Sequence, residues 1–317
     1  MEWWIIGGAG AILLLLLAAT YWAYWKAFYQ SPKNRGKVNP FPGNEQYIPY
    51  REEIRRLMDE LAATPCEKIT ISSSVDGTPL SARYYHFADG APIQILFHGY
   101  RGSAGRDFCG GFRLCREGGC NALLVDQRAH GESGSRTITF GVKERYDCLD
   151  WANYAANRFP DAKIFLVGVS MGASTVLMAS ALSLPPQVVG VMADCGYTSP
   201  KEIIQQVIGD MGLPVKLAYP LVRLGGRLFG RFDVDSASVP EALRECRLPV
   251  LMVHGEEDRF VPCEMSRTNA AACGSEVTLI TVPGAGHGMS YFADLPGYEK
   301  NVYGFVRRIS EGSAPEK

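Results

Sequence analysis

Short apolar runs recur along most of the chain, and stretches of helical length separate most of them. Six runs lie beyond residue 90: IQILFHG, NALLVD, KIFLVGV, VVGVMAD, PVLMVHG and VTLITVPG. Between the second and the third, the stretch KERYDCLDWANYAANRF has the apolar spacing of an amphipathic helix. Buried strands that alternate with helices are typical of a mostly parallel sheet with helices on both faces. The sequence therefore predicts an α/β fold with its ligand site beyond the carboxyl ends of the strands.

Two further strand-like segments precede these runs. EKITISSSV and LSARYYHF alternate apolar and polar residues, and the pair Asp76-Gly77 between them is a turn signal. They predict an antiparallel hairpin, which brings the expected sheet to eight strands. Upstream of the hairpin, residues 50–66 are expected to form a helix with an apolar face of Ile54, Leu57, Met58 and Leu61.

The first 28 residues differ from the rest in composition. No charged residue occurs from Trp3 to Trp25, and a helix of this length, at about 1.5 Å per residue, crosses a hydrocarbon layer of about 30 Å. A cleaved signal peptide is the alternative, but the start MEWW is not basic and aromatic residues occupy the place of the cleavage site. We therefore predict an uncleaved membrane anchor over residues 1–28. Aromatic residues gather at its two ends, as at membrane interfaces: Trp3, Trp4, Tyr21, Trp22, Tyr24 and Trp25.

The charges around this segment predict its orientation. Lys26, Lys33, Arg35 and Lys37 follow the span and Glu2 precedes it, so the positive-inside rule places the rest of the chain in the cytoplasm. The nine cysteines contain no C-x-x-C pair, and they indicate neither a zinc site nor a disulfide framework. A net charge of −1 gives no reason to expect a nucleic-acid partner.

These patterns divide the chain into segments. A linker rich in Pro, Gly and Asn, residues 29–49, connects the anchor to the amphipathic helix at 50–66. The α/β domain then covers residues 67–312, followed by a short tail at 313–317. Within the domain, an insertion at about 197–245 separates the runs VVGVMAD and PVLMVHG.

The insertion contains GLPVKLAYPLVRLGGRLFGRF, in which Arg223, Arg227 and Arg231 recur every fourth residue. If this segment is helical, the arginines form a basic stripe beside an apolar surface. Two interpretations remain open. The insertion is either a lid over the pocket with solvated arginines, or an interfacial helix that touches anionic lipid.

The run KIFLVGVSMGAST places a serine between two glycines at the end of a predicted strand. Gly168, Ser170 and Gly172 match G-x-S-x-G, with a strand before and a helix after, which is the context that this nucleophile motif requires. The serine then lies on a strained turn, and side chains at the two glycine positions would collide with the neighbouring strand and helix. The N-terminus of the helix also directs free N–H groups to this place. Ser170 is therefore the predicted nucleophile.

A serine hydroxyl reacts only when a base accepts its proton and an acid orients that base. The motif order is serine, acid, histidine, and only His254 and His287 follow Ser170. His254 comes directly before a group of acids, whereas His287 lies in the glycine-rich loop after the last strand, so the order favours His287 as the base. Four carboxylates compete as the acid: Asp258, its neighbours Glu256 and Glu257, and Asp194 at the end of another strand.

An acyl-transfer site also needs N–H donors for the developing oxyanion. Met171, directly after the nucleophile, is the expected first donor. The loop after IQILFHG is expected to supply the second, which we place at the main chain of Tyr100. His98 and His130 precede the nucleophile in the chain, so we expect them to brace loops rather than to act as the base.

Five stretches occur in the order FHGYRGS, LLVDQRAHGESG, LVGVSMGA, HGEEDRFVP and GAGHG. Together they resemble the α/β-hydrolase superfamily over about residues 67–310. They are most similar to its bacterial membrane-anchored abhydrolase-domain proteins, of the serine aminopeptidase and monoglyceride-lipase type. The resemblance implies Ser170 as nucleophile, Asp258 as acid and His287 as base, with the main chains of Tyr100 and Met171 as the oxyanion hole. It does not identify the substrate, because this fold supports many chemistries.

These observations predict a single-pass, membrane-anchored serine hydrolase of carboxylesterase or lipase type that cleaves an ester or thioester with an apolar acyl chain. One alternative is a serine peptidase for short peptides, with Glu256 or Glu257 binding the peptide amine. The other is a catalytically silent membrane scaffold, which has no need for a complete Ser170, Asp258 and His287 set. No metal or organic cofactor is expected. The expected partners are the acyl substrate and the membrane, and the sequence leaves the oligomeric state open.

Overall fold

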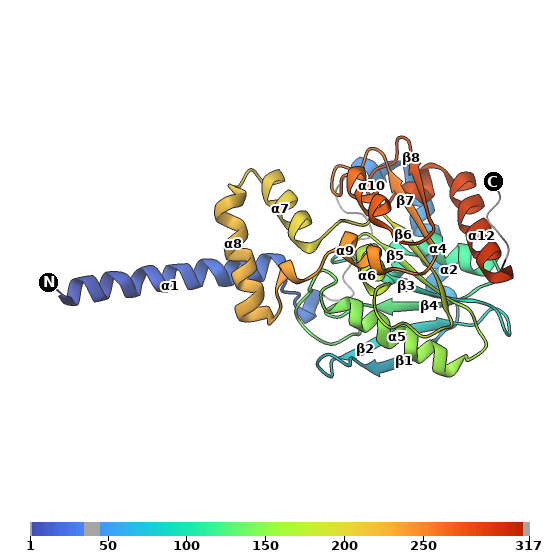
Figure 1. The fold of residues 1–317 in the computed structure, drawn as a ribbon, viewed down its shortest axis with the longest axis horizontal. Coiled ribbons are helices and arrows are strands. Elements are labelled where there is room, and N and C mark those ends of the chain that lie inside the picture. Colours follow the sequence, from blue (N-terminus) through green and yellow to red (C-terminus); the bar gives the residue numbers. More distant parts are fainter. Residues whose placement is uncertain (1, 35–44, 313–317) are drawn as a thin grey trace.

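The computed structural model describes residues 2–34 and 45–312, with side chains described for residues 10–33 and 45–312. Its centre is an eight-stranded sheet in the order β1-β2-β4-β3-β5-β6-β7-β8 (Figure 1). β2 is antiparallel to both β1 and β4, and every other pair is parallel. The strands are β1 (Glu67–Ser72), β2 (Pro79–Tyr85), β3 (Ile93–Phe97), β4 (Asn121–Asp126), β5 (Ile164–Val169), β6 (Val188–Asp194), β7 (Val250–Gly255) and β8 (Val277–Val282). The α/β prediction is therefore confirmed, with one strand at each predicted run.

Burial explains why the runs are continuously apolar. Every residue of β3 and of β7 is buried, as expected for strands with helices on both sides. Side chains alternate between the two faces: Ile93, Ile95 and Phe97 join one hydrophobic cluster, and Leu96 joins the other. At the edge of the sheet, β1 exposes most of its residues.

Helices cover both faces of the sheet (Figure 1). The first cluster contains residues of α5 (Glu144–Arg158), α6 (Met171–Ala179) and α9 (Val239–Glu245), and the second contains residues of α2 (Arg51–Ala63), α4 (Cys109–Glu117) and α12 (Leu295–Glu311). α2 is thus part of the second cluster. Apart from the N-terminal helix, the other described helices outside the insertion are η1 (Pro32–Asn34), η2 (Glu45–Tyr50), α3 (Ala104–Asp107), α10 (Cys263–Ala272) and α11 (Ser290–Ala293).

The insertion is helical and lies beside the N-terminal helix α1 (Glu2–Ala27). Ahead of α9 it forms α7 (Pro200–Asp210), α8 (Val215–Gly225), η3 (Gly226–Gly230) and η4 (Val234–Ser236). α8 crosses α1 (Figure 1). A Cβ atom at Gly225 would lie 2.8 Å from the carbonyl oxygen of Thr20 and 3.0 Å from Cβ of Tyr24. The glycine therefore permits the two helices to approach closely.

The arginines of the insertion do not form the free basic stripe that the interfacial hypothesis requires. Arg223 pairs with Asp233 at 2.9 Å and with Asp235 at 2.8 Å, and Arg227 also pairs with Asp233. Two aspartates therefore offset the charges of two of the three arginines. The third, Arg231, is exposed to solvent. The insertion does expose large apolar side chains, namely those of Met211, Leu213, Leu217, Leu224, Leu228 and Phe229. Its action as a lid stays a prediction.

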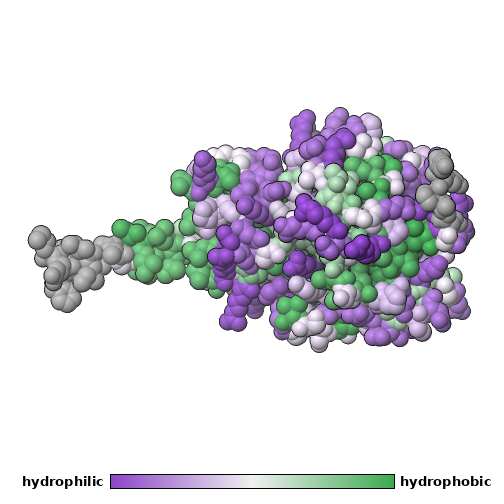
Figure 2. Space-filling model, viewed as in Figure 1, coloured by the Kyte–Doolittle hydropathy of each residue, from purple (hydrophilic) through white to green (hydrophobic). Residues whose placement is uncertain are grey.

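α1 projects from the rest of the molecule (Figure 1). Its part from Gly10 to Ala27 is apolar and long enough to cross a membrane by length and composition. The side chains from Ile12 to Leu17 are exposed, and Figure 2 shows a hydrophobic surface along this projecting part. From residue 2 to residue 19 the helix is about 27 Å long at 1.5 Å per residue. This length is close to the hydrocarbon thickness of a bilayer.

The last two turns of α1 pack against protein. Thr20, Ala23 and Tyr24 are buried, and Phe28 just beyond the helix is completely buried. The hydroxyl of Tyr24 forms a 2.7 Å hydrogen bond with that of Thr137. The expectation that Tyr24 lies at a membrane interface is therefore wrong, because an aromatic residue with a polar tip suits a protein interface equally well. Trp22 and Trp25 are exposed, and the side chains of Trp3 and Trp4 lie outside the described residues.

Phe28 is expected to be a large contributor to stability. Its ring packs edge-on against Phe232 at 5.0 Å and against Phe140 at 5.8 Å between centroids. Phe28→Ala should lower the free energy of unfolding by about 3–5 kcal/mol, because burial of the ring is lost and the surrounding side chains collapse only partly into the cavity. Denaturant unfolding of the full-length protein in detergent measures this loss. Trp22→Ala, on the exposed face of α1, is the control, and equal losses in the two variants would contradict the packing of Phe28.

Candidate active site

Ser170 lies on a sharp turn between β5 and α6. Its backbone has φ 56° and ψ −117°, a conformation that non-glycine residues rarely adopt. A Cβ atom at Gly172 would overlap the carbonyl group of Phe97 in β3, and one at Gly168 would overlap the backbone of Gly172 and Ala173 in α6. Both glycines therefore permit strand, turn and helix to meet closely, for the reason expected from the motif.

Ser170, His287 and Asp258 form a continuous chain of hydrogen bonds. The hydroxyl of Ser170 donates to Nε2 of His287 at 2.9 Å, and Nδ1 of His287 donates to Oδ2 of Asp258 at 2.6 Å. The three residues come from loops at the carboxyl ends of β5, β7 and β8. This is the geometry in which an imidazole accepts a serine proton while a carboxylate holds the ring.

Asp258 is held as an anion. Burial opposes its ionisation, but hydrogen bonds from His254 and His287 and from the backbone N–H of Val261 outweigh burial, so its pKa lies well below the usual value. The backbone N–H groups of Phe260 and Val261 each donate to Oδ1 at 2.9 Å. Oδ2 faces His287, with Nε2 of His254 also 3.2 Å away, and the carboxylate is fixed in place by the turn that carries it.

The expected oxyanion donors lie beside the serine. Met171 is the first residue of α6, so its N–H has no acceptor within the helix. The loop that leads to Tyr100 passes close to the nucleophile, since a Cβ atom at Gly99 would lie 3.3 Å from Cβ of Ser170. Oδ2 of the half-buried Asp107 accepts the N–H of Gly99 at 2.9 Å and fixes this loop.

The remaining histidines of the sequence analysis lie in bracing positions. Nδ1 of His98 donates to the carbonyl of Gly99 at 2.8 Å, and Nδ1 of His130 donates to that of Arg128 at 2.9 Å. Burial lowers the pKa of His98, which keeps its ring neutral. His254 donates through Nε2 to the carbonyl of Val261 at 2.9 Å and lies 3.2 Å from Oδ2 of Asp258. Its ring therefore supports the loop of the acid.

The model of the alpha/beta hydrolase family matches residues 94–297. The chain belongs to this family. The resemblance recognised in the five motifs is thus confirmed, and the family match covers the loops that carry the serine, the acid and the histidine.

Individual relatives are distant. The uncharacterized protein YqkD of Bacillus subtilis is 23% identical over 197 residues, which are 62% of this chain and 65% of YqkD, just under two thirds of its length. A monoacylglycerol lipase of Mycolicibacterium smegmatis is 26% identical over 233 residues, 62% of this chain and 80% of the lipase.

Solved structures of other alpha/beta proteins share the fold. The esterase Pf2001 of Pyrococcus furiosus superposes with a TM-score of 0.61 at 20% identity, over 79% of this chain and 95% of the esterase. Est1E of Butyrivibrio proteoclasticus, bound to ferulic acid, gives a TM-score of 0.60 at 21% identity, over 77% of this chain and 99% of Est1E. Identities this low establish a common fold and no more.

The three rival carboxylates lie elsewhere. Glu256 and Glu257 are exposed, and Glu256 accepts a hydrogen bond from Thr281 at 2.6 Å. Asp194 is buried and accepts a hydrogen bond from the hydroxyl of Ser290 at 3.3 Å. Among the described residues, the carboxylate hydrogen-bonded to His287 is therefore that of Asp258.

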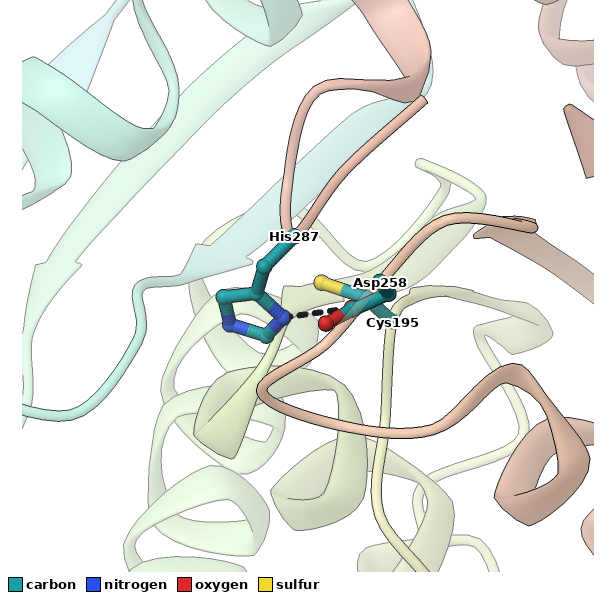
Figure 3. A group of neighbouring side chains, drawn as sticks. All are labelled: Cys195, Asp258 and His287. Atoms are coloured by element: carbon teal, nitrogen blue, oxygen red, sulfur yellow. Dashed lines mark hydrogen bonds and ion pairs between the residues drawn. The ribbon is translucent and has the colours of Figure 1, made fainter. Parts of the chain in front are cut away.

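Cys195 is a neighbour of the site that the sequence did not indicate. Its sulfur lies within 4.8 Å of the ligand atoms of Asp258 and His287 (Figure 3). Burial raises the pKa of its thiol well above the ordinary value, and the charges of Asp194 and Asp258 raise it further. A protonated thiol and a ring nitrogen already donating to a carboxylate are poor metal ligands. This chemistry favours a hydrogen-bonded group over a metal site.

Two more side chains touch the loops of the site, and sequence reasoning missed both. Arg101 reaches from the Tyr100 loop to the end of α1, and Gln46 of η2 contacts the backbone of His287. Both side chains bond main-chain atoms, which every residue type carries, so these contacts require no particular residue at the partner position. No sequence signal identifies them.

Proposed function

We propose that this protein is a membrane-anchored serine hydrolase that cleaves a carboxylic ester or thioester through an acyl-enzyme on Ser170. The observation that carries the proposal is the chain of hydrogen bonds from Ser170 through His287 to Asp258, at 2.9 and 2.6 Å. The family membership and the ester-cleaving relatives support the same activity. Hydrolases use this arrangement to activate a serine hydroxyl for attack.

The proposed reaction has two halves. Oγ of Ser170 attacks the carbonyl carbon as Nε2 of His287 accepts the serine proton, and the N–H groups of Tyr100 and Met171 stabilise the oxyanion. His287 then gives its proton to the leaving oxygen or sulfur, and the acyl-enzyme remains. In the second half, water attacks the acyl carbonyl and gives a proton to His287. This proton returns to Ser170 as the acid product leaves.

Apolar surfaces support an apolar acyl chain as the substrate group. The insertion exposes Leu217 (71%), Leu228 (51%) and Phe229 (38%). Phe229 also contacts the ring of Tyr21 in α1, at 5.2 Å between centroids, so the exposed residues of the insertion adjoin the apolar helix. The relative named as a monoacylglycerol lipase is consistent with such a substrate.

Membrane attachment through α1 is part of the proposal. Its apolar residues and length support a single span. The basic residue Lys26 lies in its last turn, and Lys33 follows it in the chain. The positive-inside rule then places the hydrolase domain on the cytoplasmic side. Cysteine-scanning accessibility in oriented vesicles tests this side directly, with the exposed Cys66 as a natural reporter.

The alternatives from the sequence have weaker support. Binding of a peptide amine by Glu256 or Glu257 would require one of them to face the serine, and Glu256 is instead bonded to Thr281. A silent scaffold has no physical requirement for the strained backbone of Ser170 or for its bond to His287.

The first test is labelling of the full-length protein in detergent with a fluorophosphonate probe. We expect the wild type to be labelled and Ser170→Ala to be unlabelled, because only an activated serine reacts with the probe. Ser180→Ala is the matched control, since its hydroxyl bonds the carbonyl of Leu177 at the other end of α6. Esters of graded acyl length and short peptides are then compared as substrates. A folded wild type that is not labelled, or that cleaves only peptides, would refute the proposal.

A further inference from the structure

The loop of the proposed oxyanion hole caps the end of the membrane helix. The hydroxyl of Tyr100 donates to the carbonyl of Ala27 at 2.8 Å. The guanidinium of Arg101 donates through Nη2 to the carbonyls of Lys26 at 2.8 Å and Tyr29 at 3.2 Å. Carbonyls at the C-terminus of a helix lack intrahelical donors, and a cation there is favoured by the helix dipole. Two hydrogen bonds to α1 and a third to Tyr29 just beyond it thus connect this end of the helix to the Tyr100 loop.

The chain just beyond α1 is itself fixed to the domain. The carbonyl of Phe28 accepts the N–H of Ile138 at 2.8 Å, and the N–H of Gln30 donates to the carbonyl of Arg136 at 2.8 Å. Together with the burial of the Phe28 ring, these bonds hold the helix end at one position. The groups that Arg101 binds are therefore a rigid support.

Gln46 makes a comparable contact with the other half of the site. Its Oε1 accepts the N–H of His287 at 3.1 Å, and its Nε2 donates to the carbonyl of His287 at 3.4 Å. The neighbouring Gly286 leaves room for this amide, because a Cβ atom there would overlap Oε1 of Gln46. One side chain from η2 therefore holds both backbone groups of the residue proposed as the base.

We propose that Arg101 and Gln46 are positioning residues that make the N-terminal region part of the catalytic site. Arg101 holds the Tyr100 loop against the end of α1, and Gln46 holds the backbone of His287. The inference rests on the proposed function. Its physical basis is that the oxyanion donors and the base act only in a narrow geometry, so that a displacement of about 1 Å lowers the rate about a hundredfold. The membrane helix is then a component of the active site as well as an anchor.

Arg101→Ala tests the first contact in the full-length protein in detergent, with a soluble short-chain p-nitrophenyl ester as substrate. We expect kcat to fall about tenfold to a hundredfold with KM nearly unchanged, because the loop binds the transition state more than the substrate. Arg101→Lys retains one donor and should recover part of the loss. Arg158→Ala is the matched control, since Arg158 bonds Glu67 at the surface, and it should keep the wild-type kcat.

Gln46→Ala tests the second contact, with Gln46→Glu as the conservative variant. A glutamate retains an acceptor for the N–H of His287 but presents an oxygen to its carbonyl, so we expect both variants to lower kcat about tenfold. The rate of fluorophosphonate labelling should fall by the same factor. Gln187→Ala is the matched control, because Gln187 donates to the carbonyl of Pro160 away from the site.

The outcomes separate the two proposals. A wild type without ester hydrolysis refutes the proposed function. A wild type that hydrolyses the ester, with kcat unchanged in Arg101→Ala and Gln46→Ala, refutes the positioning inference alone. A change in KM only, or a fall in kcat fully accounted for by unfolded protein in a thermal melt, also overturns the inference. A lower kcat in folded variants, with partial recovery in Arg101→Lys, supports it.

Discussion

Ser170→Ala in the full-length protein is expected to lower kcat for ester hydrolysis by on the order of 10⁶-fold, and His287→Ala by a similar factor. The serine is the proposed site of the acyl-enzyme, and its hydroxyl donates directly to Nε2 of His287 at 2.9 Å. Without the imidazole, the hydroxyl has no acceptor for its proton during attack. The double variant should be no slower than either single variant, since the two residues act as one unit.

Initial rates of hydrolysis of a p-nitrophenyl ester measure these losses. The wild-type rate is divided by the fraction of the protein that the fluorophosphonate probe labels, which is the active fraction. Ser180→Ala and His86→Ala are suitable controls. The hydroxyl of Ser180 bonds the carbonyl of Leu177, and His86 contacts Tyr84 and Asp89 on the hairpin. If His287→Ala retained about a tenth of the wild-type kcat, His287 would not be the base and the catalytic assignment would fail.

The strands could be predicted because each one has a local cause. β3 and β7 are buried along their whole length. Their residues are therefore apolar or small, with Gln94 and His254 as the exceptions, and this pattern is visible without knowledge of the rest of the fold. Their order in the sheet could not be predicted in this way. β4 pairs with both β2 and β3, so it separates strands that are neighbours in the sequence, and this choice depends on which helices pack on which face.

The site could likewise be predicted only where a residue has a local cause. Ser170 has a local signature, because the turn requires glycine at both flanking positions. The acid has none, apart from the family resemblance, because Asp258 and Glu257 are adjacent carboxylates in the sequence. What distinguishes them is that the turn N–H groups of Phe260 and Val261 fix only the carboxylate of Asp258 beneath His287. Such a preference arises only after the loop has folded.

The end of α1 shows a different limit. Hydropathy identifies the helix but cannot distinguish lipid from protein as its surroundings. Tyr24 and Trp25 are adjacent in the sequence and both fit an interfacial belt, yet Tyr24 is buried and Trp25 is 46% exposed. The face that packs on α8 is set by Gly225, more than two hundred positions away in the chain.

Asp258→Asn is expected to lower kcat by on the order of 10⁴-fold while the protein remains folded. The carboxylate accepts the Nδ1 proton of His287 at 2.6 Å, which leaves Nε2 free to accept the proton of Ser170. An amide in its place can present N–H₂ to Nδ1, which then requires the proton on Nε2. The ring is in the wrong tautomer for a base, and the imidazolium formed during attack loses its compensating charge. Steady-state kinetics together with a thermal melt measure the effect.

Asp194→Asn is the matched control, because Asp194 is a second buried aspartate at the end of a strand and was a rival candidate. Its kcat should stay close to that of the wild type. Burial raises the pKa of Asp194 to about 6, against the opposing effects of His254 and of hydrogen bonds from Tyr298 and Ser290. Folding therefore favours the neutral carboxyl, and its contribution to stability is lost as pH rises from the ordinary value of 3.8 to about 6. Asp194→Asn should remove this loss from the pH dependence of unfolding. If instead Asp194→Asn abolished activity and Asp258→Asn did not, the orienting acid would be Asp194, and the hydrogen bond between His287 and Asp258 would have no part in catalysis.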